Sequence, residues 1–163
     1  MKKIINIGLI GCGVVGLKRL SNLPKYFNLI ACADPKIDSV KYNFVSENIL
    51  LTKNWKDLIQ LKNLDAVIIS TTHQMHSKIL KAAIKKRLHV FIEKPGGVSA
   101  NETIKINNIL KNSKFLAVRV GFNHRYHKSI VFTKKIIDSK KLGNLVNIRA
   151  IYGKSKILNF SSS

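Results

Sequence analysis

Short runs of β-branched and aliphatic residues alternate along the chain with segments of helical periodicity. The apolar runs occupy residues 4–10, 28–33, 66–71, 89–92 and 116–121. They are almost continuously apolar, as expected of parallel strands that helices cover on both faces. The intervening helices are predicted at 14–22, 54–61, 75–86, 100–112 and 127–140, with a shorter one near 37–46. This alternation predicts an α/β fold built on a doubly wound parallel sheet.

A glycine-rich turn separates the first apolar run from the first helix. Gly11, Gly13 and Gly16 form the pattern G-x-G-x-x-G within GLIGCGVVG. Between a strand and a helix, the first glycine permits a tight turn, the second lets a diphosphate approach the backbone, and the third lets the helix pack against the strand. The motif predicts a Rossmann-like dinucleotide site that includes Val14 and Val15. A tight glycine turn that binds no ligand is the alternative.

An acidic residue, Asp34, ends the second apolar run in LIACADP, 18 residues after Gly16. A carboxylate at this place can accept hydrogen bonds from the adenosine ribose hydroxyls and repels the 2'-phosphate of NADP. We therefore predict NAD as the cofactor, and NADP is the alternative because Lys36 lies two positions further on. A turn-forming role for the Asp34–Pro35 pair is also open.

Several further motifs resemble the Gfo/Idh/MocA group, named after glucose-fructose oxidoreductase, inositol dehydrogenase and rhizopine catabolism. They are a strand end at Thr71 and Thr72 before a helix carrying His76, the E-K-P tripeptide Glu93, Lys94 and Pro95, VGFNHRYHKSI near 120–130, and KLGNLVNIRAIYG at 141–153. Together with the glycine turn, these motifs follow the family's order over almost the whole chain.

This resemblance implies an NAD(P)-dependent oxidoreductase that transfers a hydride between nicotinamide and a secondary alcohol of a sugar, cyclitol or sugar nucleotide. Lys94 would be the catalytic residue, because an ammonium group stabilises the substrate oxygen as that oxygen gains negative charge. The cofactor would contact Thr71, Thr72, His76, Glu93, Lys94 and Pro95. The substrate would be a small polyol or sugar.

The remaining candidate residues keep alternatives open. His76 is expected to face the cofactor, and a helix-capping or packing role is the alternative. Asn123 and Arg125 match family positions near the substrate, although Arg125 could equally form a salt bridge at the domain junction. His73 and His76 are not predicted to bind a metal, because no carboxylate or thiol stands nearby in the sequence.

The resemblance also predicts two domains, a dinucleotide-binding domain at 1–122 and an incomplete substrate domain at 123–163. The second would hold a connecting helix and, at 144–152, the first strand of a truncated α+β domain. Family members continue into a sheet that supplies an aspartate and a histidine general acid/base. We therefore expect a truncated form that binds NAD(H) but turns over essentially no polyol. A non-catalytic dinucleotide-binding or sensor protein is the alternative function.

One local departure from the family lies before the E-K-P strand. Arg87 stands where family members usually carry the glycine that ends the preceding helix, so we expect this helix end to be closed in another way. The effect should be confined to that turn.

The net charge of +21 raises the question of a nucleic-acid partner. Residues 1–80 carry 11 basic and 5 acidic side chains, whereas the remainder carries 18 and 3, so the excess is C-terminal. Most of these are lysines at helix-face spacing without interleaved aromatics, which favours solvated helix faces and no nucleic-acid partner. No apolar run suits a membrane span, and no signal peptide is recognised. We expect a cytoplasmic protein without a membrane partner; family members are usually homo-oligomers, but their interface domain is missing here.

Overall fold

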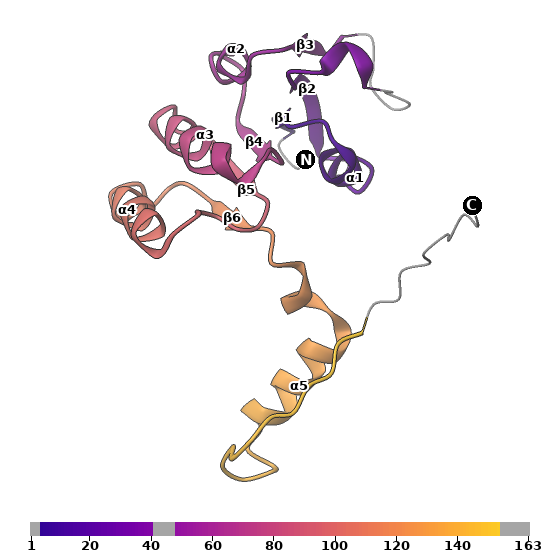
Figure 1. The fold of residues 1–163 in the computed structure, drawn as a ribbon, viewed down its shortest axis with the longest axis vertical. Helices are drawn as coiled ribbons and strands as arrows, with labels where there is room; N and C mark the ends of the chain where they lie inside the picture. Colours follow the sequence, from indigo (N-terminus) through magenta and orange to yellow (C-terminus); the bar gives the residue numbers. More distant parts are fainter. Residues whose placement is uncertain (1–3, 41–47, 154–163) are drawn as a thin grey trace, which may run out of the picture. The chain divides into compact units, whose positions relative to one another are not determined.

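The computed structural model describes residues 4–40 and 48–153, and its chain divides into two compact units, Met1–Phe122 and Asn123–Ser163 (Figure 1). The first unit contains the whole sheet and four of the α-helices assigned in the described residues.

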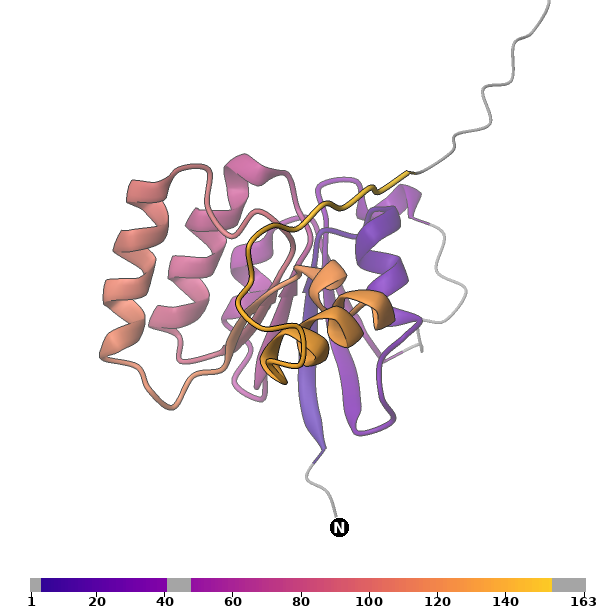
Figure 2. The same cartoon turned by 90° about the horizontal axis from the view of Figure 1, so that it is seen from below.

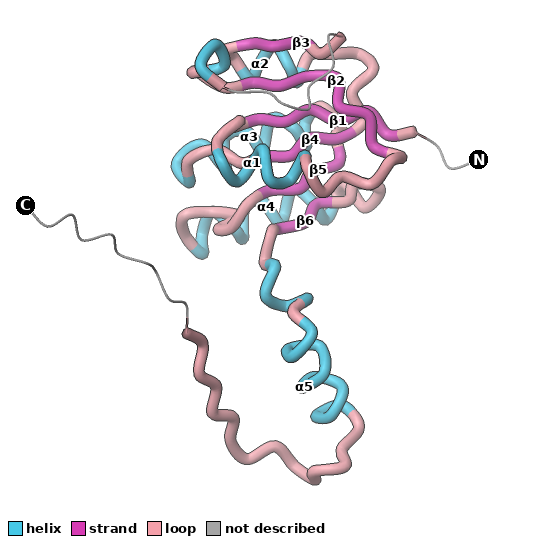
Figure 3. The backbone as a smooth tube through the Cα atoms, turned by 90° about the vertical axis from the view of Figure 1, so that its right-hand side faces the viewer, coloured by secondary structure: helices cyan, strands magenta, loops and turns pink. Residues whose placement is uncertain are grey.

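The first unit is built around one parallel sheet. Its strands are β1 (Ile5–Ile10), β2 (Phe27–Ala33), β3 (Leu50–Thr52), β4 (Ala66–Ile69), β5 (His89–Ile92) and β6 (Val118–Val120). The strand order is β3-β2-β1-β4-β5-β6, and every neighbouring pair is parallel (Figure 3). The order therefore reverses between β1 and β4, which is where ligands bind in sheets of this kind.

Helices cover both faces of this sheet (Figures 1 and 2). They are α1 (Val14–Leu20), the 3-10 helix η1 (Ile37–Ser39), α2 (Trp55–Ile59), α3 (His73–Lys85) and α4 (Ala100–Lys111). One buried cluster joins the strands to α2, α3 and α4 through side chains such as Leu58, Ile79 and Ile106. A second cluster on the α1 side contains Leu9, Leu20 and Ile68. The doubly wound α/β fold predicted from the alternation is confirmed.

Two details of the first unit differ from the expectations. The three-residue strand β3 was not predicted, because LLT is too short to stand out as an apolar run. Of the helix predicted near 37–46, the structure shows η1 at Ile37–Ser39. Residues 41–47 lie outside the described part of the chain.

The second unit contains the 3-10 helix η2 (Asn123–Tyr126) and α5 (Lys128–Asp138), as the helical pattern at 127–140 predicts. The strand predicted at 144–152 is wrong, because residues 145–153 have no regular secondary structure. Alternation of apolar and polar residues marks a segment suited to a sheet, but a strand forms only where a partner strand pairs with its backbone.

The end of α3 shows how the chain manages without the family's glycine. Arg87 itself adopts the left-handed conformation, with φ of 60°. Its N–H donates to the carbonyl of Ile84, and the N–H of Leu88 donates to that of Ala83. These are the two hydrogen bonds usually found where a left-handed residue, most often glycine, follows a helix. The expectation that this helix end is closed in another way is therefore wrong. The Arg87 side chain also contacts an aromatic ring: its guanidinium carbon lies 4.4 Å from the centre of the Phe115 ring.

We predict that Arg87→Gly is more stable than Arg87→Ala by about 1 kcal/mol, because both lose the ring contact but only alanine keeps the left-handed strain. Urea unfolding measures the difference. At the preceding Lys86, where φ is −82°, the order should reverse, since glycine only adds backbone freedom there. Equal stabilities for the two Arg87 variants would contradict the strain argument.

Candidate functional site

The glycine turn lies where the strand order reverses. Gly11 follows β1 with φ of +93°, and a Cβ atom on it would lie 2.4 Å from the carbonyl oxygen of Ser70, after β4. A Cβ atom on Gly16 would lie 2.1 Å from the carbonyl oxygen of Gly11. The loops after β1 and β4 therefore touch, and α1 begins tightly against the turn, because these two positions carry no side chain.

The middle glycine of the turn, Gly13, is not packed against neighbouring atoms. A Cβ atom on Gly13 would meet nothing within 4 Å, and Val14 and Val15 are exposed. The backbone at Gly13 thus borders open space, from which the diphosphate of a dinucleotide could approach it.

Asp34 connects this turn to the end of β2. One carboxylate oxygen, Oδ2, accepts the N–H of Cys12 at 2.8 Å, and Oδ1 accepts the N–H of Lys36 at 2.8 Å. A carboxylate has about four acceptor positions, so ribose hydroxyls can still bind to it. A cavity of about 260 Å³ beside it is lined by Gly11, Asp34, Lys36, Trp55 and Thr71, among others.

The loop after β4 carries Thr71 and Thr72. Thr72 precedes α3 as its N-cap residue but makes no capping hydrogen bond with its side chain, and both threonines line the same cavity. They therefore lie on the β4 side of the reversal, whereas Asp34 lies on the β2 side.

His76 is completely buried on α3. Its Nδ1 lies 2.8 Å from the carbonyl oxygen of Pro95, and its Nε2 lies 3.1 Å from that of Thr71. A neutral imidazole can donate to only one of these carbonyls. The ring connects the loop after β4 to the loop after β5, which fits the alternative packing role better than direct contact with a cofactor.

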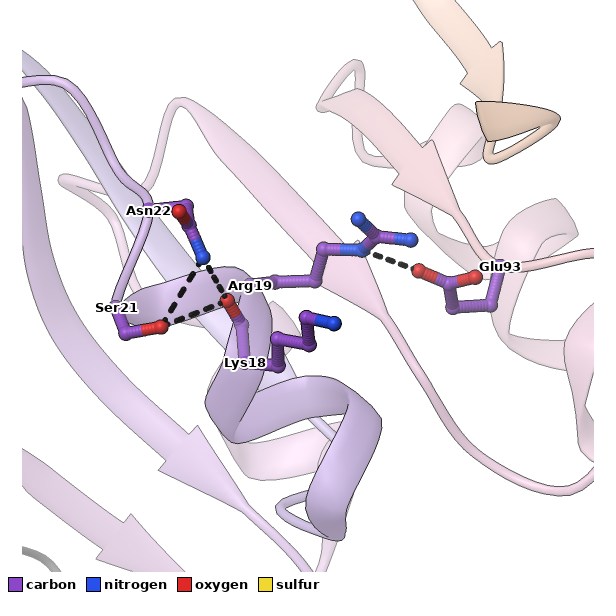
Figure 4. Close-up of polar contacts among 5 residues, drawn as sticks. All are labelled: Lys18, Arg19, Ser21, Asn22 and Glu93. Carbon is purple, nitrogen blue, oxygen red and sulfur yellow. Dashed lines mark hydrogen bonds and ion pairs between the residues drawn. The ribbon is translucent and has the colours of Figure 1, made fainter. Parts of the chain in front are cut away.

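The E-K-P tripeptide forms the loop after β5. Glu93 is buried, and Arg19 of α1 reaches it, with 2.5 Å between Arg19 Nε and Glu93 Oε1 (Figure 4). Lys94 is exposed next to it, and the Lys94–Pro95 peptide bond is cis. The structure therefore brings Glu93, Pro95 and His76 to the same edge of the sheet as the glycine turn.

The two predicted substrate residues belong to the second unit. Asn123 and Arg125 lie in η2, both are exposed, and the Arg125 guanidinium is 5.7 Å from the centre of the Tyr126 ring. Their role in substrate binding stays a prediction.

Within residues 4–40 and 48–153, no group of three or more His, Cys, Asp or Glu side chains could hold a metal ion. No helix in that part of the chain is long and apolar enough to cross a membrane.

Cys12 and Cys32 are buried, and a hydrogen bond with Cys12, together with burial, raises the pKa of the Cys32 thiol. A raised pKa disfavours the thiolate that a nucleophile or metal ligand needs.

Sequence reasoning missed two parts of this site. Arg19 carried no motif, although its position three residues after Gly16 places it one helical turn beyond the glycine. Trp55 follows the unpredicted strand β3, so nothing along the chain placed it beside Asp34.

Comparison with known proteins shows that this chain is similar to several inositol dehydrogenases. The inositol 2-dehydrogenase of Salmonella typhimurium is 29% identical over 147 residues, covering 85% of this chain and 43% of that protein. An inositol 2-dehydrogenase/D-chiro-inositol 3-dehydrogenase of Halalkalibacterium halodurans is 30% identical, covering 91% and 44%. The crystal structure of myo-inositol 2-dehydrogenase from Lactobacillus plantarum superposes with a TM-score of 0.77 at 27% identity, covering 88% and 44%. The chain thus spans less than half the length of these relatives.

Residues 5–122 match the GFO_IDH_MocA family, described as an oxidoreductase family with an NAD-binding Rossmann fold. This match covers the sheet, the glycine turn, Asp34 and the E-K-P loop. The chain therefore belongs to the Gfo/Idh/MocA oxidoreductase family, and residues 5–122 are its NAD-binding Rossmann fold.

Proposed function

We propose that the protein is an NAD-dependent oxidoreductase acting on a secondary alcohol of a cyclitol or related polyol. One observation carries the proposal: the glycine turn, Asp34 and the E-K-P loop lie at one edge of the sheet, around the reversal of strand order. A dinucleotide bound across this reversal would lie between residues suited to its two halves.

The residues present fit NAD. The open backbone at Gly13 suits the diphosphate, and the Asp34 carboxylate suits the adenosine ribose, which assigns the adenosine half to the β2 side. The nicotinamide half is then left to the β4 and β5 side, with Thr71, Thr72 and the E-K-P loop. Bound NAD would supply the hydride acceptor.

Lys94 is the residue proposed to act on the substrate. Its side chain is exposed directly after Glu93, whose carboxylate is held in place by Arg19. An ammonium group beside an alcohol oxygen stabilises the negative charge that develops there as the proton leaves. Lys94 would therefore hold the oxygen while the hydride passes from the carbon to NAD and the hydroxyl proton passes to water, since no general base is assigned in the described residues.

The substrate class follows from the relatives and remains a proposal. Three of them are named as inositol dehydrogenases, and an inositol offers a ring of secondary alcohols. Asn123 and Arg125 carry donors that suit hydroxyl oxygens. We propose that they contact the polyol.

The test is an assay of NADH formation with myo- and scyllo-inositol beside a titration of NADH binding. Because no general acid/base is assigned in residues 1–163, we expect NADH binding but essentially no inositol-dependent reduction of NAD by the unaltered chain. Lys94→Met should lower any rate that is measured by about a hundredfold or more, the usual effect of removing one such donor. NADH affinity should change by no more than about threefold, because the adenosine and diphosphate contacts remain.

Lys78→Met is the matched control, since this lysine lies on α3 and does not belong to the proposed site. Clear turnover that Lys94→Met leaves unchanged would contradict the role of Lys94. Turnover that Lys94→Met abolishes would exclude the alternative, a non-catalytic dinucleotide-binding protein, and an unaltered chain that does not bind NADH would contradict the proposed function.

A further inference from the structure

Arg19 forms the ion pair that joins the glycine-turn helix to the E-K-P loop. It lies on α1, one turn after Gly16, and its Nε donates to Glu93 Oε1 across 2.5 Å (Figure 4). The side chains of Arg19 and Glu93 are 26% and 11% exposed. Two elements separated by more than 70 positions in the sequence are therefore held together by a shielded charge pair.

The surroundings leave both groups little freedom. The Arg19 guanidinium carbon lies 5.2 Å from the centre of the Phe91 ring, so the ring and the carboxylate confine it together. The second carboxylate oxygen, Glu93 Oε2, would lie 3.1 Å from a Cβ atom on Gly121. The absence of a side chain at Gly121 makes room for the carboxylate, and Arg19 compensates the hydration that Glu93 loses on burial.

The position of the pair in the sheet indicates which half of a dinucleotide it concerns. Asp34 follows β2, on one side of the reversal between β1 and β4, whereas Glu93 follows β5, on the other side. If the adenosine half lies against Asp34, the ion pair stands beside the nicotinamide half.

We propose that Arg19 is a positioning residue, which orients the Glu93 carboxylate and, through it, the adjacent Lys94 for the nicotinamide half of NAD(H). Arg19 acts through Glu93 and need not touch the cofactor. This inference rests on the proposed function, because it requires that a dinucleotide binds at the reversal of strand order.

The experiment compares two ligands that differ at the nicotinamide end. NADH and ADP-ribose share the adenosine, the diphosphate and a second ribose, but only NADH carries the nicotinamide. We expect Arg19→Met to weaken NADH binding by about tenfold or more, the equivalent of one charged hydrogen bond. ADP-ribose binding should change by less than about twofold, which would also show that the variant is folded.

Lys18→Met is the matched control, because it removes the same charge from the neighbouring, exposed position of α1 (Figure 4). We expect it to affect both ligands alike and weakly, through the loss of long-range attraction to the diphosphate. Arg19→Lys should recover part of the NADH affinity, since an ammonium group restores the charge but not the planar guanidinium that lies over the Phe91 ring.

The outcomes distinguish a failure of the proposed function from a failure of the positioning role of Arg19. Unaltered protein that binds neither ligand would contradict the proposed function, and this inference with it. Unaltered protein that binds both, together with an Arg19→Met variant that loses NADH and ADP-ribose in parallel or loses neither, would overturn the positioning role alone. A merely structural ion pair would also show no partial recovery specific to NADH in Arg19→Lys.

Discussion

Gly16→Ala is expected to destabilise the first unit by about 3 kcal/mol or more, because its methyl group would overlap with backbone rather than with a movable side chain. The added carbon would lie 2.1 Å from the carbonyl oxygen of Gly11 and 3.3 Å from a methyl carbon of Leu9. Relief would require α1 to move away from β1, which would open the core around Leu9 and Leu20. Thermal or urea unfolding measures the loss.

Gly13→Ala is the matched variant in the same turn. Gly13 has φ of −71°, which any residue adopts, and a Cβ atom there meets nothing within 4 Å. Its stability should therefore stay within about 0.5 kcal/mol of the unaltered protein. NADH binding should weaken by about tenfold or more, since the methyl group occupies the space assigned to the diphosphate.

The two variants together separate folding from binding. A stable Gly16→Ala protein would contradict the close approach of α1 to the turn. If the Gly13→Ala protein bound NADH normally, the assignment of the diphosphate to this turn would be contradicted. A tight glycine turn that binds no ligand would then be the better interpretation of the motif. The loss of stability in one variant and of affinity in the other supports the assignment.

The fold was predictable from the sequence because a strand buried on both faces is apolar at nearly every position, as in residues 66–69 and 7–10. The same criterion fails for β3, which has three residues, two of them exposed. At 144–152 the sequence predicts a strand that the structure does not contain. Alternating apolar and polar residues describe which side chains could face a core, whereas a strand requires a partner for its backbone. The local sequence pattern therefore identifies buried strands, but it does not show whether a segment has a neighbouring strand to pair with.

The site was predictable only in part, for a related reason. Glycine spacing and the acidic residue after β2 depend on local backbone geometry, so Gly11, Gly16 and Asp34 could be recognised along the chain. The contacts of Arg19 with Glu93 and of His76 with Pro95 join distant segments through side chains. The spacing from Gly16 puts Arg19 on α1, but nothing local indicates that its side chain reaches Glu93 until the fold brings the two together.

We expect the protein to bind NADH at least about tenfold more tightly than NADPH, because one charged hydrogen bond to the ribose contributes about this much. The Asp34 carboxylate is held in place by the N–H groups of Cys12 and Lys36, each at 2.8 Å, where a 2'-phosphate would come close to it. Fluorescence titration of both cofactors at one ionic strength measures the ratio. Equal affinities would indicate that Lys36 or Lys53, which line the same cavity, offset the carboxylate.

Asp34→Asn should bring this ratio close to one. The amide keeps the shape of the side chain and one acceptor oxygen, but it can no longer accept both N–H groups or repel a phosphate. NADH affinity should therefore fall by about tenfold while NADPH affinity stays the same or rises.

Lys36→Met changes the opposite charge at the same cavity and should leave NADH affinity unchanged while lowering that for NADPH. Because the two variants shift the ratio in opposite directions, a general loss of folding cannot imitate the pattern. If Asp34→Asn weakened both cofactors equally, the role of Asp34 would be confined to holding the turn through Cys12.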